Sequence, residues 1–319
     1  MKTQAIILVA FFLILSINAS AKIWRVNNSD AVEADFTTAQ EAHDGAITGD
    51  TLYFEGSTKS YGNLIMDKRL VIIGPGYFLE SNPNTQVNKS SAKITRAEIN
   101  DGAEGSIIMG MDFWANGGYQ HDFTISTDDI TLRRCLFNQI VIQSLDDGKN
   151  VIISQCFIMY SGIKNKYTAS NNSHGMLIIT NCIINGHIWL KSLGHTIVNN
   201  YIEGNFNVYS SKVSNNIIKG SIEENHENTL KNNLSSIGSE IGTYFNLASE
   251  SPDGKFILSD NSPAKGAGEN GIDCGPFGDN YPYVLSGIPK GPHIYDATVS
   301  ATVTNEEGLS ISLKIKTQP

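Results

Sequence analysis

The sequence predicts an all-β chain whose short strands stack in parallel as a solenoid, one coil per repeat. Three observations support this prediction: a motif that recurs about every 20 residues, polar and apolar residues that alternate within it, and 31 Asn among 319 residues. Alternation with period two indicates half-buried strands. No helical pattern separates the strands, which excludes alternating βα units. A propeller blade needs about 40 residues, so a repeat of about 20 residues also excludes a propeller.

Each repeat has a short apolar strand, one or two polar residues, a Cys or Asn, and a second apolar pair. The aligned positions are spaced by 21, 26, 18, 16 and 17 residues, and they are Cys135, Cys156, Cys182, Asn200, Asn216 and Asn233. Neighbouring strands lie about 4.8 Å apart, so equivalent residues stack directly above one another. We expect the Asn amides to bond to each other and to turn backbone, and the Cys to act as small buried hydrophobes.

A second column lies six residues after Cys182, Asn200 and Asn216, and it comprises Ile188, Phe206 and Ile222. Around it, polar and apolar residues alternate. An antiparallel β-sandwich with Asn-rich turns is the alternative. Asn-Gly turn signals are few and irregularly spaced, which favours the parallel coil.

The first 21 residues have the features of a signal peptide. Lys2 precedes an apolar run of 13 residues, Ala5–Ile17, and the small residues Ala19-Ser20-Ala21 follow. The run is short for a membrane span, which needs about 20 residues. We therefore expect cleavage before Lys22 and a secreted or cell-surface protein; an uncleaved anchor is the alternative. Residue 22 is not Cys, so lipoprotein processing has no thiol to modify.

The segment Phe36–Ala46 predicts a short capping helix with a hydroxyl N-cap and a Gly stop. It would place Phe36, Ala39, Ala42 and Ala46 over the first coil, where a parallel stack exposes strand edges. The elements expected next are strands at Thr51–Glu55, Asn63–Met66 and Leu70–Ile73, then a loop over residues 74–91.

Beyond Gly291 the chain changes character. Strands are expected at Thr298–Thr304 and Ser310–Lys316, around a turn at Asn305–Gly308, as a C-terminal β-hairpin docked against the last coil. The predicted organisation is therefore a signal peptide (1–21), a parallel β-helix domain with its N-terminal cap (22–290) and a hairpin tail (291–319).

Several segments resemble a known family. Residues 36–42 (FTTAQEA), 49–54 (GDTLYF) and 70–76 (LVIIGPG) resemble the first coils of right-handed parallel β-helix proteins of the pectin-lyase-like superfamily. Residues 262–268 (SPAKGAG) and 271–277 (GIDCGPF) are similar to their C-terminal closing motif, and residues 282–289 (PYVLSGIP) to exported members common in Bacteroidetes-type bacteria. The resemblance implies a right-handed parallel β-helix. It leaves function open, because the superfamily includes lyases, hydrolases and adhesins.

Composition excludes some partners. The formal net charge is −9, the pI is about 5.2, and no Lys/Arg-rich run appears, which argues against nucleic-acid binding. No later segment is long and apolar enough to span a membrane. A polysaccharide or cell-surface glycan is the expected partner, and the oligomeric state is left open.

The candidate catalytic residues include two Asp-Asp pairs that precede successive strands, Asp128-Asp129 and Asp146-Asp147. Arg133 completes the candidate group, and Arg134 is close by. A lyase of this superfamily would need acidic residues that hold Ca²⁺ and a Lys or Arg base, whereas a hydrolase would need paired carboxylates. The alternative is that these pairs only start turns and that the Arg side chains solvate the surface. No residue here matches a lyase or polygalacturonase motif.

The candidate glycan-binding residues are aromatic or adjacent to aromatics: Trp114, Tyr119, His121 and Trp189. The first three lie in a Gly-rich segment, residues 112–122, and Trp189 lies at an outward strand position; exposed rings of this kind stack on sugars. The alternative is that Trp114 and Tyr119 only close their loop onto the coil. The His and Cys spacings match no metal motif, so no metal or cofactor is expected, except Ca²⁺ for a lyase.

Three functions follow from these features. The first is a non-catalytic, glycan-contacting protein, because a solenoid presents a long, repetitive face to extended polymers. The second is a polysaccharide lyase or glycoside hydrolase acting on an acidic polysaccharide. The third is a structural or adhesive surface protein.

Overall fold

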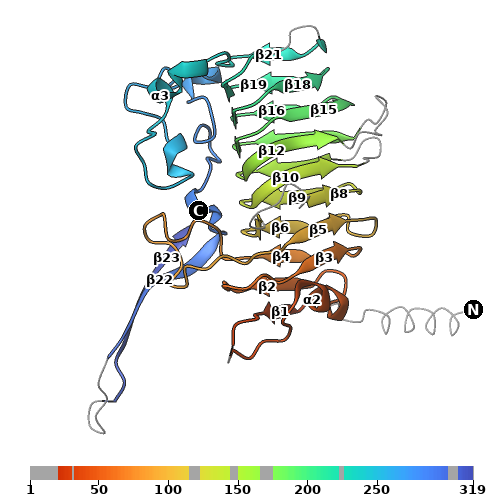
Figure 1. The fold of residues 1–319 in the computed structure, drawn as a ribbon, viewed down its shortest axis with the longest axis vertical. Coiled ribbons are helices and arrows are strands. Elements are labelled where there is room, and N and C mark those ends of the chain that lie inside the picture. Colours follow the sequence, from red (N-terminus) through yellow and green to blue (C-terminus); the bar gives the residue numbers. More distant parts are fainter. Residues whose placement is uncertain are drawn as a thin grey trace, which may run out of the picture.

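The computed structural model describes residues 21–30, 32–114, 123–143, 150–165, 175–222, 226–300 and 308–318. The predicted signal peptide lies outside these ranges, apart from Ala21. Two long sheets face each other, and every strand pair described within them is parallel (Figure 1). The prediction of an all-β, parallel chain is therefore confirmed.

The ten-stranded sheet takes one strand from each successive repeat. In spatial order its strands are β1 (Ile23–Val26), β2 (Thr51–Phe54), β4 (Val71–Ile73), β6 (Ile107–Met109), β9 (Ile130–Arg133), β11 (Asn150–Ser154), β13 (Met176–Thr180), β16 (Thr196–Val198), β19 (Lys212–Ser214) and β21 (Thr229–Lys231). The spatial order follows the chain order, as expected when each repeat adds one strand to the same sheet.

The eleven-stranded sheet is built from the alternate segments of the same repeats. Its strands are β3 (Asn63–Met66), β5 (Arg96–Ile99), β7 (Asp112–Phe113), β8 (Phe123–Ile125), β10 (Leu136–Ile142), β12 (Phe157–Asn165), β14 (Ile183–Ile184), β15 (Ile188–Leu193), β17 (Tyr201–Ile202), β18 (Phe206–Tyr209) and β20 (Ile217–Ile218). The apolar side chains that alternate inward from both sheets form one continuous buried cluster.

The predicted column of Cys and Asn residues is confirmed. The Asn200 N–H donates to Asn216 Oδ1 at 2.9 Å, the Asn216 N–H donates to Asn233 Oδ1 at 3.1 Å, and the Cys182 N–H donates to Asn200 Oδ1 at 2.8 Å. One repeat earlier, the Cys156 N–H donates to Cys182 Sγ at 3.4 Å. These residues form the Asn ladder. The Asn216 amide also donates to backbone carbonyls of β16 and β19, those of Ile197 and Ser214.

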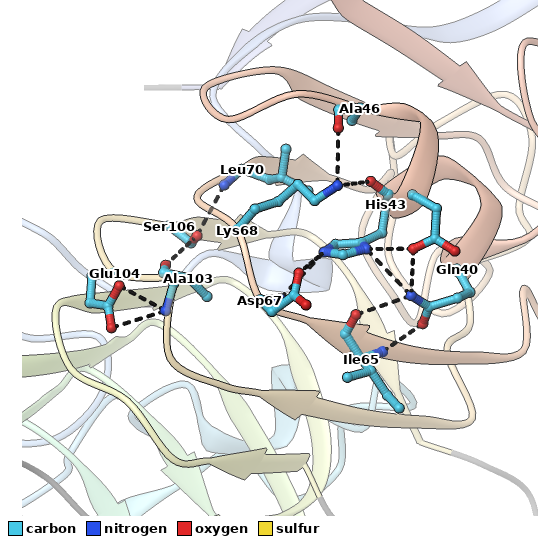
Figure 2. Close-up of polar contacts among 12 residues, drawn as sticks. Gln40, His43, Ala46, Ile65, Asp67, Lys68, Leu70, Ala103, Glu104 and Ser106 are labelled. Atoms are coloured by element: carbon cyan, nitrogen blue, oxygen red, sulfur yellow. Dashed lines mark hydrogen bonds and ion pairs between the residues drawn. The ribbon is translucent and has the colours of Figure 1, made fainter.

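The expected N-terminal helix forms as α2 (Ala39–Gly45), with Thr38 as its N-cap and Ala39 and Ala42 buried. Its Gln40 side chain pairs with the edge strand β3, as Figure 2 shows: Oε1 accepts from the Ile65 N–H at 2.8 Å, and Nε2 donates to the Ile65 carbonyl at 3.2 Å. One amide thus satisfies the N–H and the carbonyl of Ile65, two of the edge groups that a further strand would have paired. Lys68 Nζ bonds to the carbonyls of His43 and Ala46 near the C-terminal end of the helix.

A second apolar cluster lies outside the stack. Both residues of the short strands β14, β17 and β20 are buried, because a C-terminal segment packs Tyr244, Phe245 and Phe256 against their outer face. This segment is mostly irregular, and its short helices are η2 (Gly238–Glu240), α3 (Ile241–Tyr244), η3 (Gly254–Phe256), η4 (Glu269–Gly271) and η5 (Leu285–Gly287). In each of β14, β17 and β20, one apolar residue is therefore buried inside the stack and the other against the C-terminal segment.

The C-terminal hairpin forms from β22 (Gly291–Val299) and β23 (Ile311–Gln318), so its first strand begins earlier than predicted. The predicted docking against the last coil is wrong. The Val87 N–H donates to the Ile294 carbonyl at 3.0 Å, which ties the hairpin base to the loop after β4 instead. Figure 1 shows the hairpin extending away from the sheets. One face exposes the apolar side chains Ile294, Val299, Ile311, Leu313 and Ile315.

Candidate functional site

The outer face of the eleven-stranded sheet presents Trp189 to solvent. Strand β15 alternates buried and exposed residues, so Ile188 and Leu190 point inward while Trp189 and Lys191 point outward. Trp189 is 55% exposed, and this agrees with its predicted outward position. The Trp189 ring is therefore part of the protein surface and not of the core.

The strands on either side of β15 complete this surface. Trp189 is in register with Lys164 on β12 and with Asn207 on β18, so these side chains flank the indole at about 4.8 Å strand spacing. The Lys191 N–H donates to Asn165 Oδ1 at 2.5 Å, which fixes the backbone between the two strands. We call Lys164, Trp189, Lys191 and Asn207 the Trp189 face. It combines a flat ring, two ammonium groups and an amide.

The other aromatic candidates are placed differently. Trp114 is half-buried against the second apolar cluster, and its backbone N–H donates to Asp112 Oδ1 at 2.9 Å. This packing agrees with the alternative in which Trp114 closes its loop onto the coil. Tyr119 and His121 lie outside the described residues.

The candidate catalytic residues that the structure describes lie just before strand β9 and at its end. Asp128 is buried and Asp129 is exposed with φ of 55°, and both lie in the turn before β9, whereas Arg133 lies at the far end of that strand. Three residues lie between Asp129 and Arg133, and the four residue steps of extended backbone span about 13 Å. The grouping of these Asp with Arg133 in one site stays a prediction. Asp146 and Asp147 lie outside the described residues.

The residue before each column position adopts a left-handed conformation. Its φ lies between 51° and 56° at Arg134, Gln155, Asn181, Asn199, Asn215 and Asn232. Asn tolerates this conformation better than most residues, so the Asn excess serves both the turn and the ladder.

These left-handed residues hold the C-terminal segment against the stack. We call residues 268–290 the return segment, because it runs back along the turns in reverse order. Asn181 Nδ2 donates to the Gly278 carbonyl at 2.8 Å, and Arg134 Nη1 donates to the Ile288 carbonyl at 2.9 Å. Gln155 lies between them and donates to the Pro282 carbonyl. Arg134 is thus a buried structural residue, which contradicts the alternative in which it solvates the surface.

A pocket of about 450 Å³ lies between the return segment and the ten-stranded sheet. Its floor is a column across three strands, in which Arg133, Ser154 and Thr180 are in register. Its wall comes from the return segment and includes Asp279, Asn280, Tyr281, Pro282, Val284 and Lys290. Burial, together with the neighbouring Arg133 guanidinium, lowers the pKa of Arg134 to about 10, so Arg134 stays charged at neutral pH.

Local spacing gives no signal for this pocket, because its two sides are about 100 residues or more apart in the chain. The four Cys are free and buried, and burial raises the pKa values of the Cys135 and Cys182 thiols. Within the described ranges, His, Cys, Asp and Glu side chains form no group of three that could hold a metal ion.

The described helices include none with the length and apolar character needed to cross a membrane. Comparisons with models of known protein families, with curated proteins and with solved structures find no match to the chain.

Proposed function

We propose that the chain is an exported, right-handed parallel β-helix protein of the pectin-lyase-like kind, with α2 as its N-terminal cap. Two long all-parallel sheets, the Asn ladder and the Gln40 contact with the edge of β3 support this architecture. The signal-like sequence of residues 1–21 supports export. N-terminal sequencing of the protein recovered outside the cytoplasm is expected to begin at Lys22.

We further propose that the protein binds a glycan along its flank without cleaving it. The observation behind this proposal is the exposed Trp189 ring, in register with Lys164 and Asn207. An indole stacks on the apolar face of a sugar ring, and the two Lys favour a sugar that bears negative charge. Because the sheet repeats every 4.8 Å or so, an extended polymer can follow it over several strands.

The test is a panel of neutral and acidic polysaccharides, measured by calorimetry for binding. Trp189→Ala is expected to weaken binding of the recognised glycan about tenfold. Tyr53→Ala is the matched control, because Tyr53 is also an exposed aromatic but lies on the other sheet. Equal binding by wild type and Trp189→Ala would contradict the proposed site.

The same panel separates binding from catalysis. A lyase would release unsaturated product that absorbs in the ultraviolet, and a hydrolase would release reducing ends. We expect neither product from a glycan that binds. Product formation by the wild-type protein, lost on substitution of Asp128 or Asp129, would favour the enzyme alternative.

One observation favours the adhesive alternative: the exposed apolar face of the β22–β23 hairpin. A two-stranded hairpin is marginally stable alone, so an apolar face on it is costly unless something covers it. Replacing Ile311 and Leu313 with Lys is expected to reduce attachment to the cell surface if the hairpin acts as an anchor. Unchanged attachment, measured by cell fractionation, would remove this alternative.

A further inference from the structure

We infer that the pocket between the return segment and the ten-stranded sheet binds a small organic anion, a carboxylate attached to a ring. This site is separate from the Trp189 face, since it lies on the other sheet and shares no residue with it. Its volume of about 450 Å³ lies within the range of small-molecule sites, about 300–1,000 Å³.

The floor of the pocket positions a guanidinium on a rigid strand. Arg133 ends β9, and its Nε donates to Ser154 Oγ at 3.3 Å on the next strand. This contact holds the side chain across the sheet. The two terminal nitrogens of a guanidinium form a planar fork that matches the two oxygens of a carboxylate.

The charge around the pocket is predominantly positive. Arg133, Arg134 and Lys290 line it, against the single carboxylate of Asp279. Among the described residues, neither Arg133 nor Lys290 has a carboxylate within ion-pair distance. In a chain of net charge −9, two cations without such a partner beside one pocket indicate an anionic ligand.

The remaining lining is suited to a ring. Ile152 contributes an apolar patch to the floor, while Pro282, Val284 and the 72% exposed Tyr281 contribute apolar surface and an aromatic ring to the wall. Ser154, Thr180 and Asn181 add hydrogen-bonding groups. An inorganic anion would make no contact with this apolar surface. A carboxylate attached to a ring contacts both the cationic side chains and the apolar surface.

The experiment is calorimetric titration of the full mature chain with four probes. Two are acids, glucuronate and benzoate, and two are their neutral counterparts, glucose and benzyl alcohol. At least one acid is expected to bind with 1:1 stoichiometry, at least about tenfold more tightly than its counterpart. Binding of glucuronate but not benzoate would identify a sugar acid as the ligand type. Binding of benzoate but not glucuronate would identify an acid on an apolar ring.

Variants assign the binding to this pocket. Arg133→Gln and Lys290→Ala are each expected to weaken the acid about tenfold, and Arg133→Lys to recover part of the loss. Lys255→Ala removes another exposed Lys outside the pocket, and Trp189→Ala removes the separate glycan face; both should bind as wild type. Thermal melting confirms that each variant is folded, and the exposed Lys290 provides a variant that leaves the core untouched.

Three results would overturn the inference. They are failure of both acids to bind, equal binding of an acid and its neutral counterpart, and wild-type affinity in both Arg133→Gln and Lys290→Ala. Loss of acid binding in Trp189→Ala alone would also overturn it, by assigning the acid to the other face. Failure here leaves the glycan proposal intact, because that proposal depends on Trp189.

Discussion

Two side-chain columns lie at opposite ends of the same strands. Both accept hydrogen bonds from backbone N–H groups, but they use different residue types. After the strand, the Asn ladder receives turn N–H groups through identical amides, as when Asn216 accepts from Asn200. Before the strand, the His195 N–H donates to Ser211 Oγ at 3.1 Å, and the Ser211 N–H donates to Asn228 Oδ1 at 3.0 Å. We call this second column the mixed ladder.

The comparison shows what a parallel stack requires at its turns. A buried backbone N–H needs an acceptor, and any side chain of suitable reach in the next repeat can supply it. The Asn ladder adds amide-to-amide bonds, because Nδ2 of Asn200 also donates to Oδ1 of Asn216 at 3.0 Å. The mixed ladder makes fewer bonds per residue, so we expect its substitutions to cost less.

The largest expected effect is that of Asn216→Ala. Asn216 accepts two hydrogen bonds from Asn200 and donates to Ile197, Ser214 and Asn233. Its loss leaves several buried backbone groups without partners, so the free energy of unfolding should fall by about 4 kcal/mol. Urea denaturation measures this change.

The control for Asn216→Ala is Asn205→Ala, an exposed Asn whose side chain is outside both ladders. It should change stability by less than about 0.5 kcal/mol. A similar cost for both variants would show that the ladder contributes no more than an ordinary surface Asn.

The next effect is acid sensitivity of the mixed ladder. Burial lowers the pKa of His195 from 6.5 to about 4, and its Nδ1 accepts from the Leu177 N–H at 3.2 Å. Between these pH values the unfolded chain binds a proton that the folded chain does not. The stability due to the neutral ring is therefore present above pH 6.5 and lost as pH falls, by about 3 kcal/mol at pH 4.

Denaturation midpoints measured from pH 7 to pH 4 test this effect. The variant His195→Gln keeps a hydrogen-bonding side chain but cannot titrate, so its stability should fall less steeply over that range. Parallel curves for the two proteins would contradict the assigned pKa.

A smaller effect is expected for Ser211→Ala. The hydroxyl accepts from His195 N–H and donates to the Tyr209 carbonyl at 2.7 Å. Its removal leaves one buried N–H without an acceptor, which costs about 1.5 kcal/mol. A cost equal to that of Asn216→Ala would remove the distinction between the ladders.

The smallest effect is expected at the Cys end of the Asn ladder. Cys182→Ala removes a weak acceptor for the Cys156 N–H and a small buried sulfur, at a cost of about 1 kcal/mol. In wild-type protein the four buried thiols should react with a thiol reagent only after unfolding. Rapid reaction of the folded protein would contradict this burial.

The two ladders also explain which parts of the fold the sequence could predict. The Asn ladder was predictable because one residue type recurs at one position of the repeat. The mixed ladder was not, because His195, Ser211 and Asn228 share a geometric role but no residue type. The Gln40 contact with β3 was missed for the same reason, since a single Gln gives no pattern.

The candidate sites divide in a similar way. Trp189 was predictable as exposed, because alternation within one strand decides which face a side chain takes. The pocket was not predictable, because its lining combines Arg133 with Tyr281 and Lys290 from the distant return segment. No periodic pattern in the sequence relates residues so far apart in the chain. The grouping of Arg133 with Asp128 and Asp129 was based on their closeness in the chain, which gives no information on residues 279–290.

Hydrogen exchange at the amides of Asn200 and Asn216 tests the stacked register, on which both proposed surfaces depend. In wild type both amides should exchange only on global unfolding, while in Asn216→Ala the Asn200 amide should exchange much faster. Exchange of both amides at the rate of an unstructured peptide in the wild-type protein would contradict the register.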